Sequence, residues 1–164
     1  MKRKIFLLVL SLFSFELSVA QKEGVCLRIF IAPDCPISIK YIPTLKELHA
    51  NYSEKIRIDY YFPKEYTKAE AREFESQYAF PASIRIDKEN KVIKELSIST
   101  TPEVYLIKDE TIVYRGAIDN WFYALGKNRI EPSIHYLANA LDALLEEKLP
   151  QIEKTRPVGC LISL

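Results

Sequence analysis

Apolar and polar residues along this chain follow two spacings, and the first is that of β-strands. Five short segments are rich in β-branched or aromatic residues: 25–31, 56–62, 83–86, 103–108 and 111–114. Residues 56–62 alternate between polar and apolar, as half-buried strands do. Asp109 and Glu110 separate the last two segments, which are therefore predicted to form a hairpin.

The second spacing is helical. An apolar stripe predicts a helix over 37–52, formed by Ile39, Ile42, Leu45 and Leu48. A longer stripe predicts a helix over 133–148, formed by Ile134, Leu137, Ala138, Leu141, Leu144 and Leu145. Thr67 and Glu70 form a capping-box pattern at the start of a helix over 67–78. A short helix is expected over 87–96 and a loop over 121–127. Strands that alternate with helices indicate the α/β class.

The N-terminus has the pattern of a secretory signal. Basic Lys2, Arg3 and Lys4 precede an apolar run over 5–15, and Ser18-Val19-Ala20 fits a small-x-small cleavage site. We therefore expect a signal peptide over 1–20, a domain over 21–148 and a C-terminal tail over 149–164. Export to the periplasm or beyond the cell follows. An uncleaved membrane anchor is the alternative, although the apolar run is short for a membrane span.

Charge and hydropathy exclude two classes of partner. The formal net charge is +1, so there is no electrostatic case for binding nucleic acid. No segment after the signal is long and apolar enough to cross a bilayer, so no stable membrane insertion is expected after cleavage. No cofactor is predicted. A copper site of the C-x-x-x-C kind is absent because residue 39 is isoleucine, and His49 and His135 are lone histidines within predicted helices.

Cys35 is the strongest candidate for chemistry. It follows the first predicted strand directly and precedes the first predicted helix, with Pro36 at the first helical position. A helix N-terminus offers unpaired N–H groups and a positive dipole end, which stabilise the thiolate form of cysteine. A nucleophilic or redox role is therefore favoured over a buried structural thiol.

Several motifs resemble the thioredoxin superfamily, in particular exported redoxin-like proteins of the alkyl hydroperoxide reductase and thiol-specific antioxidant group. Phe30-x-Ala32-x-x-Cys35-x-x-Ser38 is similar to the F-x-A-x-x-C-x-x-C active-site turn, and Pro43 matches the proline that kinks the first helix. Further matches lie at 100–104 (TTPEV) and 114–119 (YRGAID).

The resemblance implies a thioredoxin-like fold, with a central mixed sheet flanked by helices on both faces. It also implies that Pro102 forms a cis-proline turn beside Cys35, where the family contacts its substrate. Ser38 replaces the usual second cysteine, and its hydroxyl either donates to the Cys35 thiolate or has no chemical role.

A second thiol must then come from elsewhere in the chain, from a partner or from a small thiol. The chain has three cysteines, so at least one is unpaired within a monomer. Residues 149–160 can span roughly 40 Å, so Cys160 can reach Cys35. Cys26 lies about 20 Å from the far end of its strand, too far to pair with Cys35. It is expected to be a buried apolar residue or a structural partner of Cys160.

We therefore expect an exported thiol–disulfide oxidoreductase that acts on protein or small-molecule thiols and disulfides. Cys35 is its nucleophile, Cys160 or an external thiol resolves the mixed disulfide, and Ser38 and Pro102 orient the sulfur. One alternative is a weak thiol peroxidase, although Ala32 stands where peroxiredoxins carry a hydroxyl residue. Another is a non-catalytic binding module with a Cys26–Cys160 disulfide. Ile29 stands where thioredoxins carry a buried acid, so proton transfer would need another base or none.

Overall fold

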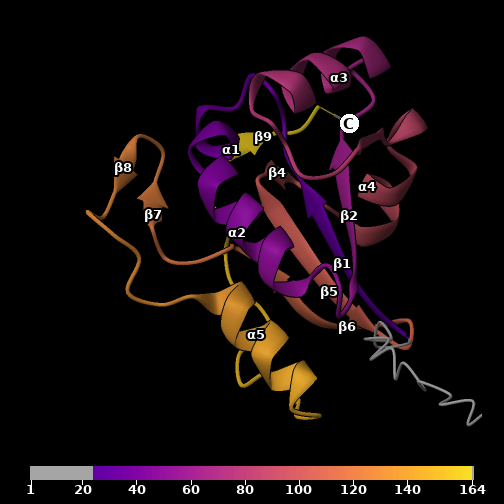
Figure 1. Ribbon diagram of the computed structural model, residues 1–164. Helices are drawn as coiled ribbons and strands as arrows, with labels where there is room; N and C mark the ends of the chain where they lie inside the picture. Colours follow the sequence, from indigo (N-terminus) through magenta and orange to yellow (C-terminus); the bar gives the residue numbers. More distant parts are fainter. Residues whose placement is uncertain (1–23, 164) are drawn as a thin grey trace, which may run out of the picture.

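The computed structural model describes residues 24–163, and its centre is a five-stranded mixed sheet (Figure 1). The strand order is β3-β2-β1-β5-β6. The strands are β1 (Val25–Phe30), β2 (Arg57–Phe62), β3 (Ile84–Ile86), β5 (Glu103–Lys108) and β6 (Thr111–Gly116). The predicted α/β fold with a mixed sheet is confirmed, and all five predicted strands are present to within one or two residues.

The first strand lies at the centre of the sheet and is buried along its length except at Arg28, which is partly buried. It pairs in parallel with β2, where Ile29 lies opposite Tyr60, and antiparallel with β5, where Ile29 lies opposite Val104. Neighbouring residues point to opposite faces, so Leu27 and Ile29 enter one core and Phe30 enters the other. A strand that is buried on both faces reads as a near-continuous apolar run, as residues 25–31 do.

Helices cover both faces of the sheet, in agreement with the prediction (Figure 1). The larger core joins one face to α1 (Pro36–Lys40), α2 (Ile42–Tyr52), α3 (Lys68–Gln77) and α5 (Tyr136–Leu145). The smaller core joins Phe30, Tyr61 and Tyr105 on the other face to α4 (Lys91–Leu96). A 3₁₀ turn, η1 (Lys88–Asn90), precedes α4.

The helix predicted over 37–52 is divided in two at Tyr41. Pro43 is the second residue of α2 and has no N–H for a helical hydrogen bond, so the continuous helix ends before it. Tyr41 is buried, and its hydroxyl donates to the carboxylate of Asp119. This contact anchors the break to the segment that follows β6.

Helix α3 begins at the predicted capping box, which is confirmed. The Thr67 hydroxyl accepts from the Glu70 N–H at 3.2 Å, and the Glu70 carboxylate accepts from the Thr67 N–H at 2.7 Å. Two of the free N–H groups at the helix start are therefore satisfied by local sequence alone.

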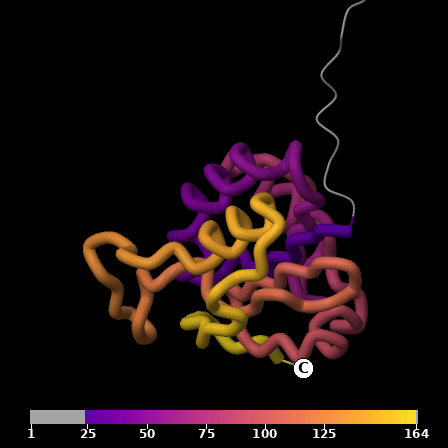
Figure 2. The backbone as a smooth tube through the Cα atoms, turned by 90° about the horizontal axis from the view of Figure 1, so that it is seen from below, coloured from indigo at the N-terminus to yellow at the C-terminus, as the bar shows by residue number. Residues whose placement is uncertain are grey.

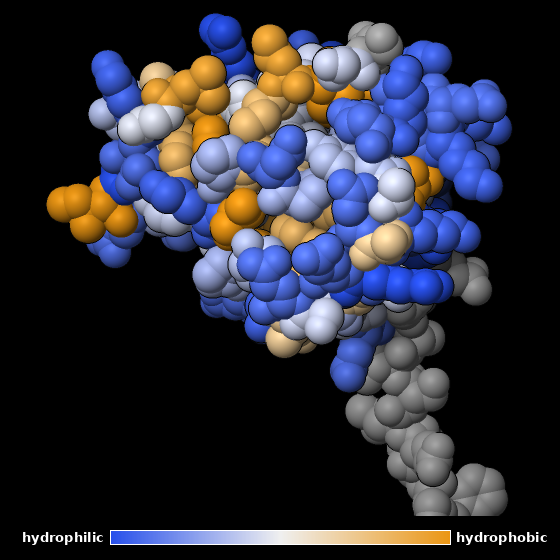
Figure 3. All heavy atoms as spheres, turned by 90° about the horizontal axis from the view of Figure 1, so that it is seen from above, coloured by the Kyte–Doolittle hydropathy of each residue, from blue (hydrophilic) through white to orange (hydrophobic). Residues whose placement is uncertain are grey.

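The prediction of a loop over 121–127 is wrong. β7 (Phe122–Ala124) and β8 (Lys127–Asn128) form a small hairpin that projects from the body, in orange in Figures 1 and 2. Tyr123, Leu125 and Ile130 are exposed, and the view from above shows a hydrophobic group at the tip of this projection next to hydrophilic residues (Figure 3). The predicted helix over 133–148 is also shorter, beginning at Tyr136.

The C-terminal segment first packs against the edge strand β6 and then continues to a short strand near the active-site turn. Figure 2 shows it leaving α5 and returning along the body. The Arg115 N–H donates to the Glu153 carbonyl, and the Thr155 N–H donates to the Arg115 carbonyl. Gly116 has a φ of +129°, and a Cβ there would lie 2.2 Å from the Thr155 carbonyl oxygen. Only glycine permits this close approach, which guides the segment towards β9 (Cys160–Leu161).

Candidate active site

The turn after β1 places Cys35 at the N-cap of α1. The Cys35 carbonyl accepts from the Ile39 N–H at 3.0 Å, and the Cys35 N–H donates to the Ala32 carbonyl at 3.3 Å. The thiol makes no capping bond and instead donates to the Thr101 carbonyl at 3.1 Å. The Thr101–Pro102 peptide bond is cis. Cys35 and the Pro102 turn are therefore neighbours, although 66 residues separate Cys35 from Thr101.

Cys160 reaches the same place from the C-terminal segment. Strand β9 pairs antiparallel with β4 (Thr100–Thr101), with Cys160 opposite Thr101 and Leu161 opposite Thr100 (Figure 1). Cys160 packs against the core cluster that contains Cys35, and each thiol shifts the pKa of the other. Cys35 has no exposed surface, whereas Cys160 is partly exposed. Cys160 is therefore the more accessible of the two thiols.

Ser38 lies one helical turn after Cys35 and is fully buried. Its hydroxyl oxygen accepts from the Ala32 N–H at 3.3 Å, which leaves the hydroxyl proton free to donate to the Cys35 sulfur. The Ser38 hydroxyl and the Ser38 N–H both act to lower the pKa of Cys35. This placement is compatible with the predicted donation from Ser38 to the Cys35 thiolate.

The two thiols of the pair have opposite pKa shifts. Burial raises the pKa of Cys35, but donors from Cys160 and Ser38 outweigh burial and lower the pKa overall. Burial, the bond to Cys35 and the nearby negative charges of Cys35 and Asp34 raise the pKa of Cys160 to about 12. Cys35 is therefore the thiol that ionises first, and Cys160 stays protonated at neutral pH.

Asp34 has a partner that the sequence did not reveal. The Tyr66 hydroxyl donates to the Asp34 carboxylate, and burial together with this bond raises the pKa of Tyr66. Asp34 and Tyr66 line a small cavity of about 340 Å³ beside the active turn, together with Glu70 and Glu73. No local motif links Tyr66 to the turn, because the two meet only when the loop after β2 folds over it.

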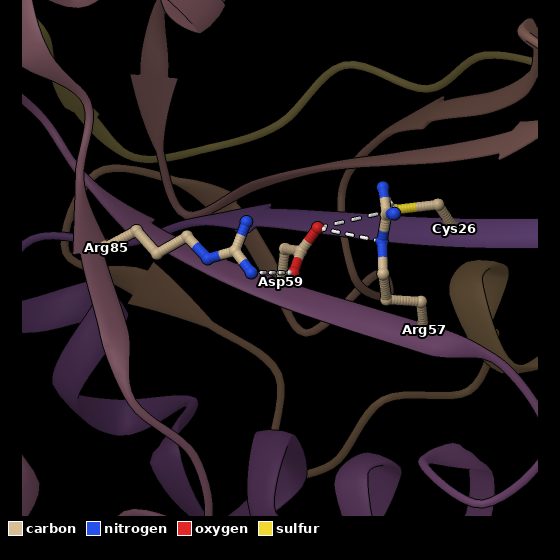
Figure 4. A network of polar contacts seen from close by, with 4 residues as sticks. All are labelled: Cys26, Arg57, Asp59 and Arg85. Carbon is tan, nitrogen blue, oxygen red and sulfur yellow. Dashed lines mark hydrogen bonds and ion pairs between the residues drawn. The ribbon is translucent and has the colours of Figure 1, made fainter.

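Cys26 belongs to a separate polar network at the other end of β1 (Figure 4). The Arg57 guanidinium donates to the Cys26 sulfur at 3.2 Å, and the Cys26 thiol lies 3.6 Å from the Asp59 carboxylate. Asp59 forms ion pairs with Arg57 and with Arg85, each at 3.1 Å. Cys26 is buried, and burial raises its pKa. It also lines a cavity of about 810 Å³ with Arg28 and Arg57.

The expected alternative of a Cys26–Cys160 disulfide is not supported by this arrangement. Cys26 lies opposite Ile107 on β5, and Cys160 lies opposite Thr101. Six residues separate Ile107 from Thr101, which corresponds to about 20 Å of extended chain, and a disulfide needs Cα atoms within about 7 Å. All three cysteines are free thiols in the structure.

Among residues 24–163, no three side chains of the His, Cys, Asp or Glu type gather in a way that could hold a metal ion. His49 packs against the ring of Tyr60, with its Nδ1 3.4 Å from the Tyr60 hydroxyl. Within the same range, no helix combines the length and apolar character that crossing a bilayer requires. The predicted signal segment lies outside the described residues.

These features define a thioredoxin-like fold, with a cysteine at the strand-to-helix turn that faces a cis-proline. Comparison with solved structures supports the fold. An uncharacterized conserved protein from Geobacillus kaustophilus has a TM-score of 0.73 at 24% identity, over 90% of this chain and 81% of its own. A hypothetical protein from Sinorhizobium meliloti has a TM-score of 0.71 at 22% identity, over 85% of this chain and 79% of its own.

StoA from Bacillus subtilis is a more distant match, with a TM-score of 0.52 at 17% identity, over 59% of this chain and 75% of its own. A scan against protein-family models found no match, and a search of curated proteins found no significant relative. The shared property of these matches is the fold, since their identities are below a quarter.

Proposed function

We propose that this protein is an exported thiol–disulfide oxidoreductase in which Cys35 and Cys160 cycle between a dithiol and a disulfide. The observation that carries the proposal is that Cys160 pairs with Thr101, the residue whose carbonyl accepts from the Cys35 thiol at 3.1 Å. The pKa values of the two thiols are also shifted in opposite directions. A nucleophile with a lowered pKa beside a protonated second thiol is the arrangement that disulfide exchange requires.

The reaction proceeds in two exchanges. The Cys35 thiolate attacks one sulfur of a partner disulfide, so that a bond forms between Cys35 and the partner while the partner's own S–S bond breaks. The departing sulfur takes up a proton. Cys160 then loses its proton to water and attacks the Cys35 sulfur, which forms the Cys35–Cys160 disulfide and releases the partner's second thiol. The partner gains two electrons and the protein loses two; the reverse sequence oxidises a dithiol.

The contacts of Ser38 and of the Pro102 turn support positioning roles for both. Ser38 donates to the charged form of Cys35, and the Thr101 carbonyl that precedes Pro102 accepts from its neutral form. Residues 1–20 would act as a signal that delivers the domain to an oxidising compartment, where disulfides persist. Partners would be protein or small-molecule thiols and disulfides.

Disulfide mapping tests this function directly. The purified protein would be oxidised and then alkylated, digested and analysed by mass spectrometry, beside a sample reduced with dithiothreitol. We expect a Cys35–Cys160 bridge that forms and reduces reversibly, with Cys26 as a free thiol. Cys26→Ala is the matched control and should leave the bridge intact. If Cys35 and Cys160 both remain alkylatable after oxidation, the proposed cycle is wrong.

Peroxide consumption distinguishes the thiol peroxidase alternative. In that reaction Cys35 would attack hydrogen peroxide and become a sulfenic acid, with water as the second product. The thiol-exchange proposal predicts no catalytic loss of peroxide in the presence of dithiothreitol. Sustained peroxide turnover that disappears in Cys35→Ala would favour the peroxidase instead.

A further inference from the structure

Residues 159–163 run along residues 99–101 as an added strand, beside the Thr101 carbonyl that accepts from the Cys35 thiol. Besides the pairing of β9 with β4, the Ile162 N–H donates to the Ser99 carbonyl at 3.1 Å, and the Asn90 side chain donates to the Ser163 carbonyl at 3.2 Å. Cys35 has no exposed surface, and Cys160 of this strand packs against the core cluster to which Cys35 belongs. A macromolecular partner therefore has no route to the Cys35 sulfur while the strand is in place.

Gly159 is the residue that permits this cover. A Cβ built at Gly159 would lie 2.2 Å from the Thr101 carbonyl oxygen, 2.7 Å from the Thr101 carbonyl carbon and 3.2 Å from the Pro102 nitrogen. All three are backbone atoms, and Thr101 is itself buried, so relief of the clash would require a shift of buried backbone. Any larger residue at this position would lift Cys160 away from Thr101 and from Cys35.

Beyond Cys160 the strand makes one specific side-chain contact. Ile162 packs against the smaller core, next to residues that include Phe30, Ile98 and Tyr105. Leu161 points away and is 84% exposed. The surface around β4 therefore favours an extended segment with glycine before the cysteine and an apolar residue two positions after it. The residue directly after the cysteine is not selected.

We propose that Gly159 is the positioning residue that holds residues 159–163 as a removable cover over Cys35, and that a partner polypeptide reaches Cys35 by exchanging for this strand. The proposal rests on the proposed function and names its substrate class: an extended segment of the form glycine-cysteine-any-apolar. Most of the pairing is through the backbone, so an external segment can occupy the same edge. The built-in strand competes with it because the strand is tethered at high effective concentration.

The exchange fits the two-step reaction. A partner segment that displaces the cover brings its disulfide to Cys35, and the Cys35–partner bond forms as the partner's S–S bond breaks. When residues 159–163 return to β4, Cys160 replaces the partner cysteine opposite Thr101 and attacks Cys35. Return of the cover and release of the partner are therefore one event.

Activated peptides test the proposal in the Cys160→Ser variant, which cannot resolve a mixed disulfide. One peptide has the sequence of residues 155–163, and the other has alanine in place of its glycine. In both, the cysteine is linked to thionitrobenzoate, so attack by Cys35 on the peptide sulfur releases a coloured thiolate and leaves a Cys35–peptide disulfide. We expect the glycine peptide to react at least about tenfold faster than the alanine peptide. Equal rates would overturn the proposal.

Displacing residues 159–163 tests whether this strand limits the access of peptides to Cys35. Adding Gly159→Ala to Cys160→Ser should displace residues 159–163 and speed the reaction of Cys35 with the glycine peptide about tenfold or more, with the preference for the glycine peptide retained. Ser76→Ala, added to Cys160→Ser in the same way, is the control, because Ser76 is exposed near the end of α3. Circular dichroism and the melting temperature would verify that both variants fold. An unchanged rate in folded Gly159→Ala would show that the strand does not cover Cys35.

Failure of this inference is separable from failure of the proposed function. If the unmodified chain forms a reversible Cys35–Cys160 disulfide but Cys160→Ser does not discriminate between the peptides, the redox cycle stands and strand exchange is refuted. If no such disulfide forms, the proposed function itself fails, whatever the peptide rates.

Discussion

Ser38→Ala is the substitution that most directly tests how this fold activates Cys35. The Ser38 hydroxyl has two effects, since it accepts from the Ala32 N–H and lowers the pKa of the Cys35 thiol. Alanine removes both while leaving the backbone N–H of residue 38 in place. Because Ser38 is fully buried, no water can readily replace its hydroxyl.

The size of each effect follows from these contacts. A hydrogen bond to a charged group contributes about 1.5–3 kcal/mol, and about 1.4 kcal/mol corresponds to a tenfold change in an equilibrium. Loss of the Ser38 donor should therefore reduce the thiolate fraction of Cys35 about tenfold at a fixed pH below its pKa. The more basic thiolate is a better nucleophile, so the rate of attack should fall less, about three- to fivefold. The unpaired Ala32 N–H should lower the free energy of unfolding by about 1–3 kcal/mol.

The assay is the pH dependence of Cys35 ionisation in the reduced protein, followed by the ultraviolet absorbance of the thiolate and by peptide-resolved alkylation. Urea unfolding would give the change in stability separately. Ser76→Ala is the matched control, because Ser76 is an exposed serine near the end of α3. The titration of Cys35 should move to higher pH only in Ser38→Ala. A loss of stability with an unchanged titration would refute the electrostatic role of Ser38 and leave it purely structural.

Three further predictions concern stability and pH. Phe74→Ala should destabilise the fold by about 3–5 kcal/mol in urea unfolding, because the ring is buried against other aromatic rings of the larger core. Thr67→Ala should cost about 1 kcal/mol and move the pKa of Glu70, which the capping bond lowers, back towards its ordinary value in an NMR titration. In pH-resolved alkylation of the reduced protein, Cys35 should ionise first, because its pKa is lowered, while Cys160 stays protonated until about pH 12. If Cys160 were labelled at lower pH than Cys35, their roles as nucleophile and resolver would be reversed.

Local sequence was enough to predict much of this fold. The strands and the β5–β6 hairpin follow from apolar runs and alternation, and the start of α3 follows from Thr67 and Glu70. The position of Cys35 between β1 and α1 was also evident, because a strand that leads directly into a helix needs only adjacent residues to specify it. These features share one property: the interactions that define them lie within a few residues along the chain.

Other features depend on where distant segments meet. The β7–β8 hairpin was not predicted, because its residues lack the regular alternation that marks a strand. The network of Cys26 with Arg57, Asp59 and Arg85 was missed, since it joins residues from three different strands. Each of these contacts is decided by tertiary packing, which a local pattern does not encode.

The partner of Cys160 shows this division most clearly. The number of residues after α5 established only that Cys160 could reach Cys35, because a flexible segment of that length can reach many places on the domain. The contacts of the segment along β6, the close approach at Gly159 and the pairing of β9 with β4 place the thiol beside Cys35 rather than Cys26. The sequence alone determined the reach of the second thiol, and the packing of the folded chain decided which cysteine it meets.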